Sequence, residues 1–231
     1  MKHFFLTGLF LGLALVLVVG AVFALKGRPV ASQTADPVDA LAPSAPAATE
    51  NWNQIAFPVD ATGDIPDAQA IADNIDGAEE IRYWDASVQG FVFYIPDPVI
   101  PGGAGTNFST QVGGSYWVKQ AASTQTVFSI VGDVPPPTGQ AGAIQHNLQG
   151  DAANCKWNNI MVPLDQDTIS TAQDLADSIG DVYEVRGWRA DSQGFAFYIP
   201  DPVIPGGAGT NFAVKIGYPY WVCMTASKTW P

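Results

Sequence analysis

The chain contains one stretch of sequence twice, and this repetition constrains its fold more than any other feature. Residues 91–108 read FVFYIPDPVIPGGAGTNF, and residues 195–212 repeat them with a single difference, Val92 against Ala196. The similarity continues on both sides of this stretch, where aromatic and apolar residues recur at matching places. A duplication of this length indicates one supersecondary unit used twice, so the fold has to be predicted for one repeat and then doubled.

The duplication predicts two small modules, at residues 51–131 and 144–231, joined by a Pro- and Gly-rich linker at 132–143. Each repeat opens with a short apolar strand and then shows one helical pattern. A hairpin, a Pro/Gly loop and a final Tyr-Trp-Val strand follow. Prolines in the loop prevent it from continuing a central strand. We therefore expect a mainly β fold (α+β in detail), made of two tandem antiparallel β modules with one short helix each.

The helical pattern is clearest in the second repeat. Its apolar residues recur at helical spacing on one face, at Ala172, Leu175, Ala176 and Ile179. Ser170 or Thr171 can cap the start of this helix, and Gly180 can end it.

The two repeats differ at their ends. The first continues through residues 126–131, an alternating pattern that predicts a strand, whereas the second stops near Trp230. The second has instead a leading segment, 144–148, and we expect one of these segments to bridge the modules. If 144–148 does not fill the gap, the open sheet edge predicts self-association by strand addition. Internal filling is the simpler expectation.

The N-terminal region predicts export. Residues 4–25 are uncharged and strongly apolar, and their length suits a membrane-spanning helix. The small residues around Ala21 and Ala24 favour a cleaved signal peptide instead, so residues 1–25 are either an anchor or a signal. Residues 26–50, rich in Ala, Pro and Ser, predict a disordered stalk. We expect an extracytoplasmic protein, membrane-anchored through this segment or secreted.

Two cysteines, Cys155 and Cys223, are present. They occupy the places at which the first repeat has Glu50 and Lys119, a negative and a positive residue. Both pairs make sense if the first and last strands of a module lie side by side there. We predict a Cys155–Cys223 disulfide, which suits an oxidising compartment.

Charge and side-chain chemistry exclude several functions. The net charge of −12 disfavours binding to nucleic acid, which depends on Lys and Arg. The chain has only two histidines, His3 and His146, so neither repeat offers a Ser-His-Asp arrangement. The acidic turns, including Asp60, Asp64, Asp67, Asp165 and Asp167, share no spacing and are predicted to be solvated rather than calcium-binding. We expect no enzymatic activity, no metal and no cofactor.

The duplicated loop and the aromatics are the remaining candidates for a site. The loop predicts an exposed interaction surface, and the alternative is that its aliphatic residues cap the module's own core; the candidate residues are Pro96, Asp97, Val99, Ile100, Pro200, Asp201, Val203 and Ile204. Asp97 and Asp201 are also the one pair of carboxylates open to glycoside hydrolysis, although turn formation explains them better. The repeated tryptophans are expected mostly in the module cores, and sugar stacking is the alternative.

Residues 157–165 (WNNIMVPLD), 171–176 (TAQDLA) and 217–222 (GYPYWV), together with Trp188, resemble a tandem module of exported bacterial surface or secreted proteins. Gln54 and Asn159 depart from its pattern, which prefers Leu there, and so does Arg189, where it prefers Asp. The resemblance implies a non-catalytic extracellular module and transfers no site residues. We expect a structural or interaction protein whose partner is a protein or polysaccharide at the cell surface. The alternative is a carbohydrate-binding module that uses the aromatics and the loops.

Overall fold

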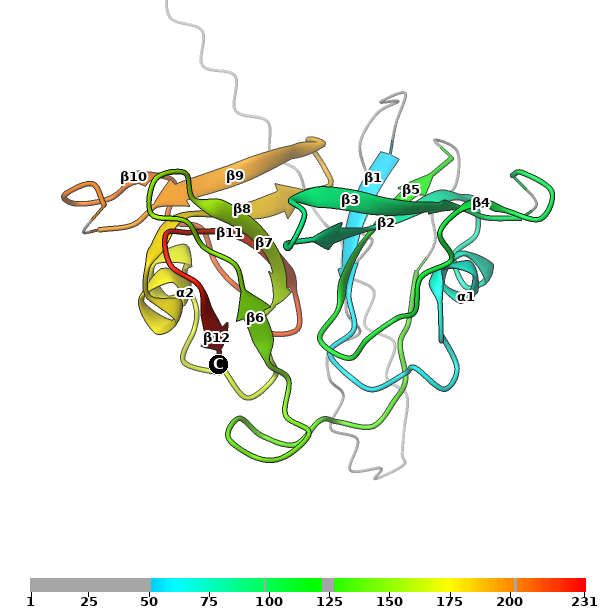
Figure 1. The fold of residues 1–231 in the computed structure, drawn as a ribbon, viewed down its shortest axis with the longest axis horizontal. Coiled ribbons are helices and arrows are strands. Elements are labelled where there is room, and N and C mark those ends of the chain that lie inside the picture. The colour runs from blue at the N-terminus through cyan, green and yellow to red at the C-terminus, as the bar shows by residue number, and fades with distance from the viewer. Residues whose placement is uncertain (1–50, 98, 122–126, 202) are drawn as a thin grey trace, which may run out of the picture. The chain divides into compact units, whose positions relative to one another are not determined.

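The computed structural model describes residues 51–97, 99–121, 127–201 and 203–231. These residues form a mainly β fold with two five-stranded antiparallel sheets, each accompanied by a short helix (Figure 1). The predicted fold class is confirmed at this level. The predicted anchor or signal, the stalk and Glu50 lie outside the described residues. Within the described ranges, no helix has the length and apolarity needed to cross a membrane.

The two sheets have the same strand order. In the first module it is β1-β5-β2-β3-β4, and in the second it is β7-β11-β8-β9-β10. The first module contains β1 (Asn51–Ala56), α1 (Ala68–Asp73), β2 (Ala78–Asp85), β3 (Gly90–Ile95), β4 (Ala104–Gly105) and β5 (Ser115–Gln120). The second contains β7 (Lys156–Met161), α2 (Ala172–Ile179), β8 (Val182–Arg189), β9 (Gly194–Ile199), β10 (Ala208–Gly209) and β11 (Pro219–Met224). Two further strands, β6 (His146–Leu148) and β12 (Lys228–Trp230), form a separate pair.

Helix α2 begins and ends where its sequence predicts. The Thr171 hydroxyl accepts a hydrogen bond from the Asp174 amide at 3.1 Å, and the Asp174 carboxylate accepts one from the Thr171 amide at 2.9 Å. This reciprocal pair is a capping box. Gly180 ends the helix with a φ of 71°, a conformation that glycine adopts without strain. In α1 the cap is Asp67, whose carboxylate accepts from the Ala70 amide at 2.9 Å.

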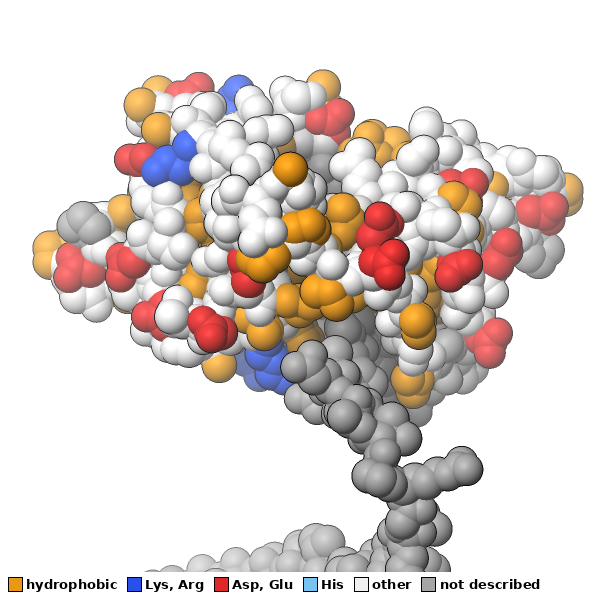
Figure 2. All heavy atoms as spheres, turned by 90° about the horizontal axis from the view of Figure 1, so that it is seen from below, with side chains coloured by type: hydrophobic (Ala, Val, Ile, Leu, Met, Phe, Trp, Pro, Cys, Tyr) orange, Lys and Arg blue, Asp and Glu red, His pale blue; other side chains and the backbone are white. Residues whose placement is uncertain are grey.

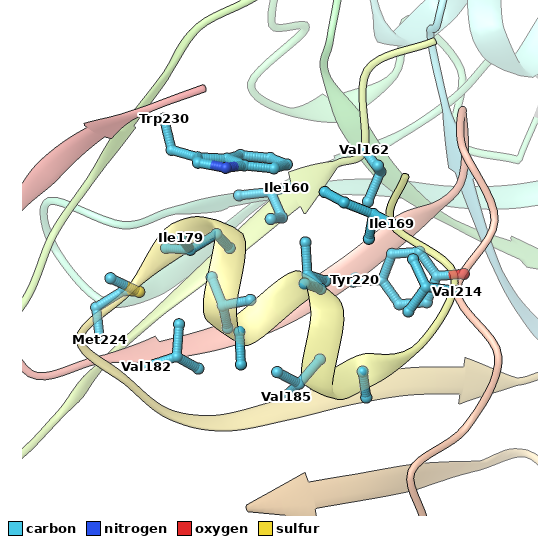
Figure 3. Packing of buried hydrophobic residues seen from close by; sticks show 14 of the residues in the cluster. Ile160, Val162, Ile169, Ile179, Val182, Val185, Val214, Tyr220, Met224 and Trp230 are labelled. Carbon is cyan, nitrogen blue, oxygen red and sulfur yellow. The ribbon is translucent and has the colours of Figure 1, made fainter. Parts of the chain in front are cut away.

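Each helix covers one face of its own sheet, and the module core lies between them. In the second module, Ile179 from α2 belongs to the same core as Ile160, Val185 and Tyr220 from the strands (Figure 3). Trp230 from β12 closes one end of this core. Because side chains alternate along a strand, the neighbours of these strand residues point to the opposite face of the sheet. That face is therefore free to contact something other than the helix.

The ends of the repeats differ from the prediction in one respect. Residues 127–131 do not form a strand; Phe128 instead packs into the core of the first module. Thr126 lies outside the described residues. The chain is held just beyond this segment, where Asp133 and Asp60 exchange backbone hydrogen bonds at 2.8 and 3.2 Å. The alternating apolar residues of 127–131 therefore indicate a segment that packs on the core but does not join the sheet.

The leading segment of the second repeat pairs with the C-terminal strand. β6 pairs with β12 in antiparallel register, so the C-terminal strand has an internal partner. Ile144, just before β6, packs against Ala56 of the first module and Met161 of the second. The expected bridging role of 144–148 is thus met through Ile144. The β6–β12 pair is separate from the five-stranded sheet, so self-association by strand addition stays a prediction.

The predicted disulfide joins Cys155 and Cys223, with their Cα atoms 5.4 Å apart. Cys223 lies in β11, and Cys155 immediately precedes β7, the neighbouring strand. In the first module the equivalent strands β1 and β5 are also paired, and Lys119 lies opposite Trp52. The inferred adjacency of first and last strands is confirmed in both modules. A disulfide of this kind is typical of an oxidising, extracytoplasmic compartment.

Candidate ligand-binding pocket between the modules

The six repeated tryptophans lie at the contact between the modules and not in the module cores, where we expected most of them. Neither module core contains any of the six. Instead, Trp84 of the first module packs edge-on against Trp221 of the second, with ring centroids 5.1 Å apart. Trp117 and Trp188 make the equivalent contact at 4.8 Å. The tryptophans occupy the sheet faces that the helices leave uncovered.

Two glutamine side chains form hydrogen bonds between the modules across this contact. The side chain of Gln193 accepts a hydrogen bond from the Trp52 amide at 2.8 Å and donates one to the Trp52 carbonyl oxygen at 3.0 Å. Gln89 makes the same two bonds, with the same lengths, to the backbone of Trp157. Since β1 and β7 are edge strands, each glutamine satisfies backbone groups that a neighbouring strand would otherwise bond.

Two indole groups repeat this exchange. The Nε1–H of Trp188 donates to the Trp52 carbonyl oxygen at 3.1 Å, and that of Trp84 donates to the Trp157 carbonyl oxygen at 2.8 Å. Each of these glutamine and tryptophan contacts therefore occurs twice with the roles of the modules exchanged, as at the interface of a two-fold symmetric dimer. The duplicated chain contains this symmetric interface within one molecule.

A pocket of about 340 Å³ opens along the same contact. It is almost entirely aromatic, with one arginine from each module. The lining residues are Trp52, Arg82, Phe91, Trp117, Trp157, Arg186, Trp188, Phe195 and Trp221. A concave, mainly apolar site with a few polar groups is the usual form of a small-molecule binding site, and this volume is near the lower end of the usual range.

The arginines of the pocket are held in fixed positions. The Nε of Arg82 donates to the Glu80 carboxylate at 2.5 Å, and its guanidinium lies 4.3 Å from the centroid of the Trp52 ring. In the second module, Arg186 donates to Glu184 at 2.6 Å and lies 4.3 Å from the Trp157 ring. An ion pair on one side and a cation–π contact on the other restrict each guanidinium before any ligand binds.

Several polar side chains at the contact have no hydrogen-bond partner among the described residues. In the first module these are Gln54 and the indole nitrogen of Trp117, which stand opposite each other on β1 and β5. In the second they are Asn159 and the indole nitrogen of Trp221, opposite each other on β7 and β11. Buried polar groups without partners are destabilising. Gln54 and Asn159 are also the two places where the resembling module prefers leucine.

The duplicated loops are anchored at Asp97 and Asp201 and carry exposed side chains. Gln69 of α1 accepts from the Tyr94 hydroxyl at 2.8 Å and from the Asp97 amide at 3.2 Å, and it donates to the Asp97 carbonyl oxygen at 3.3 Å. Gln173 of α2 anchors the second loop through the same set of bonds. The aliphatic side chains Val99, Ile100, Val203 and Ile204 remain 39–48% exposed. The expectation that the loops are exposed therefore agrees with the structure.

The loop carboxylates do not come together. Asp97 lines a hollow of the first module with Gln69, Asp73, Tyr94 and Gly102. Asp201 lines a separate hollow of the second module, formed by the equivalent residues. Nothing brings Asp97 and Asp201 into one sugar-sized cleft, which glycoside hydrolysis would require.

The acidic turns act as local caps. Asp60 accepts hydrogen bonds from the Thr62 hydroxyl and amide, which lower the pKa of its carboxyl. Asp165 accepts from the Thr138 amide of the linker at 2.6 Å. In the described part of the chain, no three His, Cys, Asp or Glu residues are grouped as metal ligands.

His146 belongs to the packing of β6. Its Nε2–H donates to the Met161 carbonyl oxygen at 2.8 Å, and its ring stacks on Trp230. Burial lowers the pKa of this imidazole to about 4, so the ring is neutral at pH 7.

A further hollow, of about 200 Å³, lies beside the linker and is lined mainly by prolines. The linker runs along the lower side of the molecule in Figure 1. Figure 2 shows this side, where acidic side chains are spread around a central group of hydrophobic ones. The hollow has no arginine or lysine in its lining, unlike the pocket between the modules.

We found no family model, no curated protein and no solved structure that matches the chain. The site therefore has to be interpreted from its own residues. Sequence reasoning missed Arg82, Arg186, Gln89 and Gln193, although each pair occurs at equivalent positions in the two repeats. That equivalence was the available signal, because a polar residue kept in both copies of a short strand or turn often has a specific partner.

Proposed function

We propose that the protein is a non-catalytic extracytoplasmic interaction protein that binds a ring-shaped ligand, such as a sugar unit of a surface polysaccharide, between its two modules. The observation that carries this proposal is the pocket itself, with seven aromatic side chains and two fixed arginines from both repeats. Aromatic rings provide apolar faces for a ring to pack against, and the arginines provide directed hydrogen-bond donors.

The edge of the pocket is accessible. Phe91 and Phe195 line it and are 42% and 41% exposed, so a ligand can reach them without unfolding of the module. Phe93 and Phe197 follow on the same strands and face the same side, with similar exposure, but they lie outside the pocket. The chain thus offers matched variants for a test.

The test is a binding screen against immobilised polysaccharides and soluble oligosaccharides. Saturable binding by the wild-type protein should be lost in the Phe91→Ala/Phe195→Ala variant and retained in the Phe93→Ala/Phe197→Ala control. Equal loss in both variants, or binding that neither variant affects, would place the ligand elsewhere and contradict the proposal.

The exposed loops are a second candidate surface, for a protein partner. Gln69 and Gln173 fix the start of each loop at Asp97 and Asp201, and an anchored segment loses less entropy on binding than a free one. The Ile100→Ser/Ile204→Ser variant should lower the free energy of unfolding by less than about 1 kcal/mol, because these side chains are largely exposed. Ile71→Ala, a fully buried control in α1, should cost about 2–5 kcal/mol. A loop variant as destabilised as the control would show that the loop caps the core.

A further inference from the structure

We propose that the pocket between the modules selects an anionic ring compound, a sugar or aromatic ring carrying a carboxylate, which Arg82 and Arg186 bind from opposite modules. This inference rests on the proposed function and names the ligand class for the same pocket.

The first argument is the set of donors that remains on each arginine. A guanidinium has five N–H donors and no acceptor. The Nε–H of Arg82 is used by Glu80, and that of Arg186 by Glu184. Within the described residues, no hydrogen bond engages the terminal nitrogens of either group. These nitrogens present the paired N–H geometry that fits a carboxylate.

The second argument is which half of each ion pair is accessible. The side chains of Glu80 and Glu184 are only 15% and 12% exposed, whereas those of Arg82 and Arg186 are 35% and 39% exposed. The more buried carboxylates hold the arginines in place, and the arginine side chain is the more accessible half of each pair. A ligand in the pocket therefore meets the two guanidinium groups before the carboxylates that pair with them, although the chain as a whole carries a net charge of −12.

The third argument excludes cationic ligands. Aromatic pockets commonly bind ammonium groups through cation–π contacts. Here the faces of Trp52 and Trp157 already carry the guanidinium groups of Arg82 and Arg186. A further cation would meet two like charges, and a neutral ring would leave the arginine donors unused. The volume of about 340 Å³ suits one or two rings.

Isothermal titration calorimetry of the full-length protein tests the preference for a carboxylate with three probes. They are digalacturonate, the matching galactose disaccharide without carboxylates, and 2-naphthoate. A carboxylate probe should bind at least about tenfold more tightly than the neutral disaccharide, since hydrogen bonds to charged groups contribute about 1.5–3 kcal/mol. Its affinity should fall as salt is raised. Digalacturonate and naphthoate distinguish the two sources of the carboxylate, a sugar or an aromatic compound.

Charge variants supply the control. Arg82→Gln and Arg186→Gln should each weaken binding of the carboxylate probe about tenfold or more. Arg189→Gln makes the same change of net charge at an exposed residue outside the pocket and should leave the affinity unchanged. Arg82→Lys keeps the positive charge but loses the paired N–H donors of the guanidinium, so it should also weaken binding. This variant replaces Arg82→Gln if Arg82→Gln fails to fold.

The outcomes separate the two proposals. If the neutral disaccharide binds as tightly as digalacturonate and Phe91→Ala/Phe195→Ala abolishes both, the pocket binds sugar and the anionic class is wrong. If the carboxylate probe binds equally well to Arg82→Gln, Arg186→Gln and the wild type, the arginines do not bind the carboxylate and this inference is wrong. If no probe binds at millimolar concentration, both this inference and a sugar-binding function fall.

Discussion

The side-chain amide of Gln193 pairs with both backbone polar groups of Trp52, accepting from its amide at 2.8 Å and donating to its carbonyl oxygen at 3.0 Å. This contact joins residues 141 positions apart and is repeated by Gln89 and Trp157. Each module thereby protects the edge strand of the other. The same contact places the aromatic faces of the two sheets together and forms the pocket.

The buried amides at the contact predict an unusual gain of stability. Gln54→Leu and Asn159→Leu should each leave the free energy of unfolding unchanged or raise it by up to about 1 kcal/mol, because leucine removes polar atoms that lack hydrogen-bond partners among the described residues. Asn53→Leu, on the same strand, is the contrasting control, since Asn53 donates to Gln120 at 3.1 Å. Urea denaturation measures all three. Marked destabilisation by Gln54→Leu and Asn159→Leu would show that these amides are partnered in solution.

The loop glycines predict a difference between neighbours. Gly102 and Gly103 have φ values of +80° and +71°, so alanine is strained at both, by about 1–2 kcal/mol. A Cβ at Gly103 would in addition overlap the Tyr94 hydroxyl, whereas at Gly102 it would meet open space. Gly103→Ala should therefore destabilise the protein by at least about 1 kcal/mol more than Gly102→Ala. Equal melting temperatures of the two variants would contradict the packing of Tyr94 against this loop.

The disulfide predicts a substantial contribution to stability. The cysteines are 68 residues apart, and a loop of this length lowers the entropy of the unfolded chain by the equivalent of about 4 kcal/mol at most. Cys155→Ala/Cys223→Ala should lower the free energy of unfolding by about 2–4 kcal/mol, measured by urea denaturation. Peptide mapping of non-reduced protein should recover the linked pair. Two free thiols in protein purified without reductant would refute the cross-link.

His146 predicts a pH dependence between the two pKa values of its imidazole. The pKa is about 4 in the folded protein and 6.5 in the unfolded chain, so the unfolded state binds more protons in this window. Stability should therefore fall as the pH drops from 6.5 to 4, by up to roughly 3 kcal/mol. The carboxyls of Asp60, Asp85 and Asp174 also have lowered pKa values, through hydrogen bonds from Thr62, Ser87 and Ser170, but they act below their ordinary value of 3.8.

Urea midpoints measured from pH 7 to pH 4 check this prediction. His146→Phe keeps an aromatic ring beside Trp230 and removes the titrating group, so its midpoint should change much less over the same range. A wild-type curve that is flat between pH 6.5 and 4 would mean that His146 is solvated in the native state.

Most helices and strands of each module could be predicted from the sequence, but the way in which the two modules contact each other could not. Helical spacing and capping residues located α2, and the pairing of Cys155 and Cys223 followed from the alignment of the repeats. The tryptophans were harder to place, because both faces of these sheets are apolar. Period-two alternation separates the faces of a strand but does not say which face meets the helix and which meets another module. The pocket arises only from that second contact, so no single repeat could reveal it.

The central claim is that the two modules hold each other through this symmetric contact, and cutting the linker tests it most directly. A protease site introduced at residues 139–142, an exposed part of the linker, would allow cleavage between the modules. Sedimentation velocity of the cleaved protein should show one species with the mass of the intact chain. Gln89→Ala/Gln193→Ala, which removes the four glutamine hydrogen bonds between the modules, should promote its separation. Two separate species with the unequal masses of the two fragments, from the cleaved wild-type protein at micromolar concentration, would contradict the account.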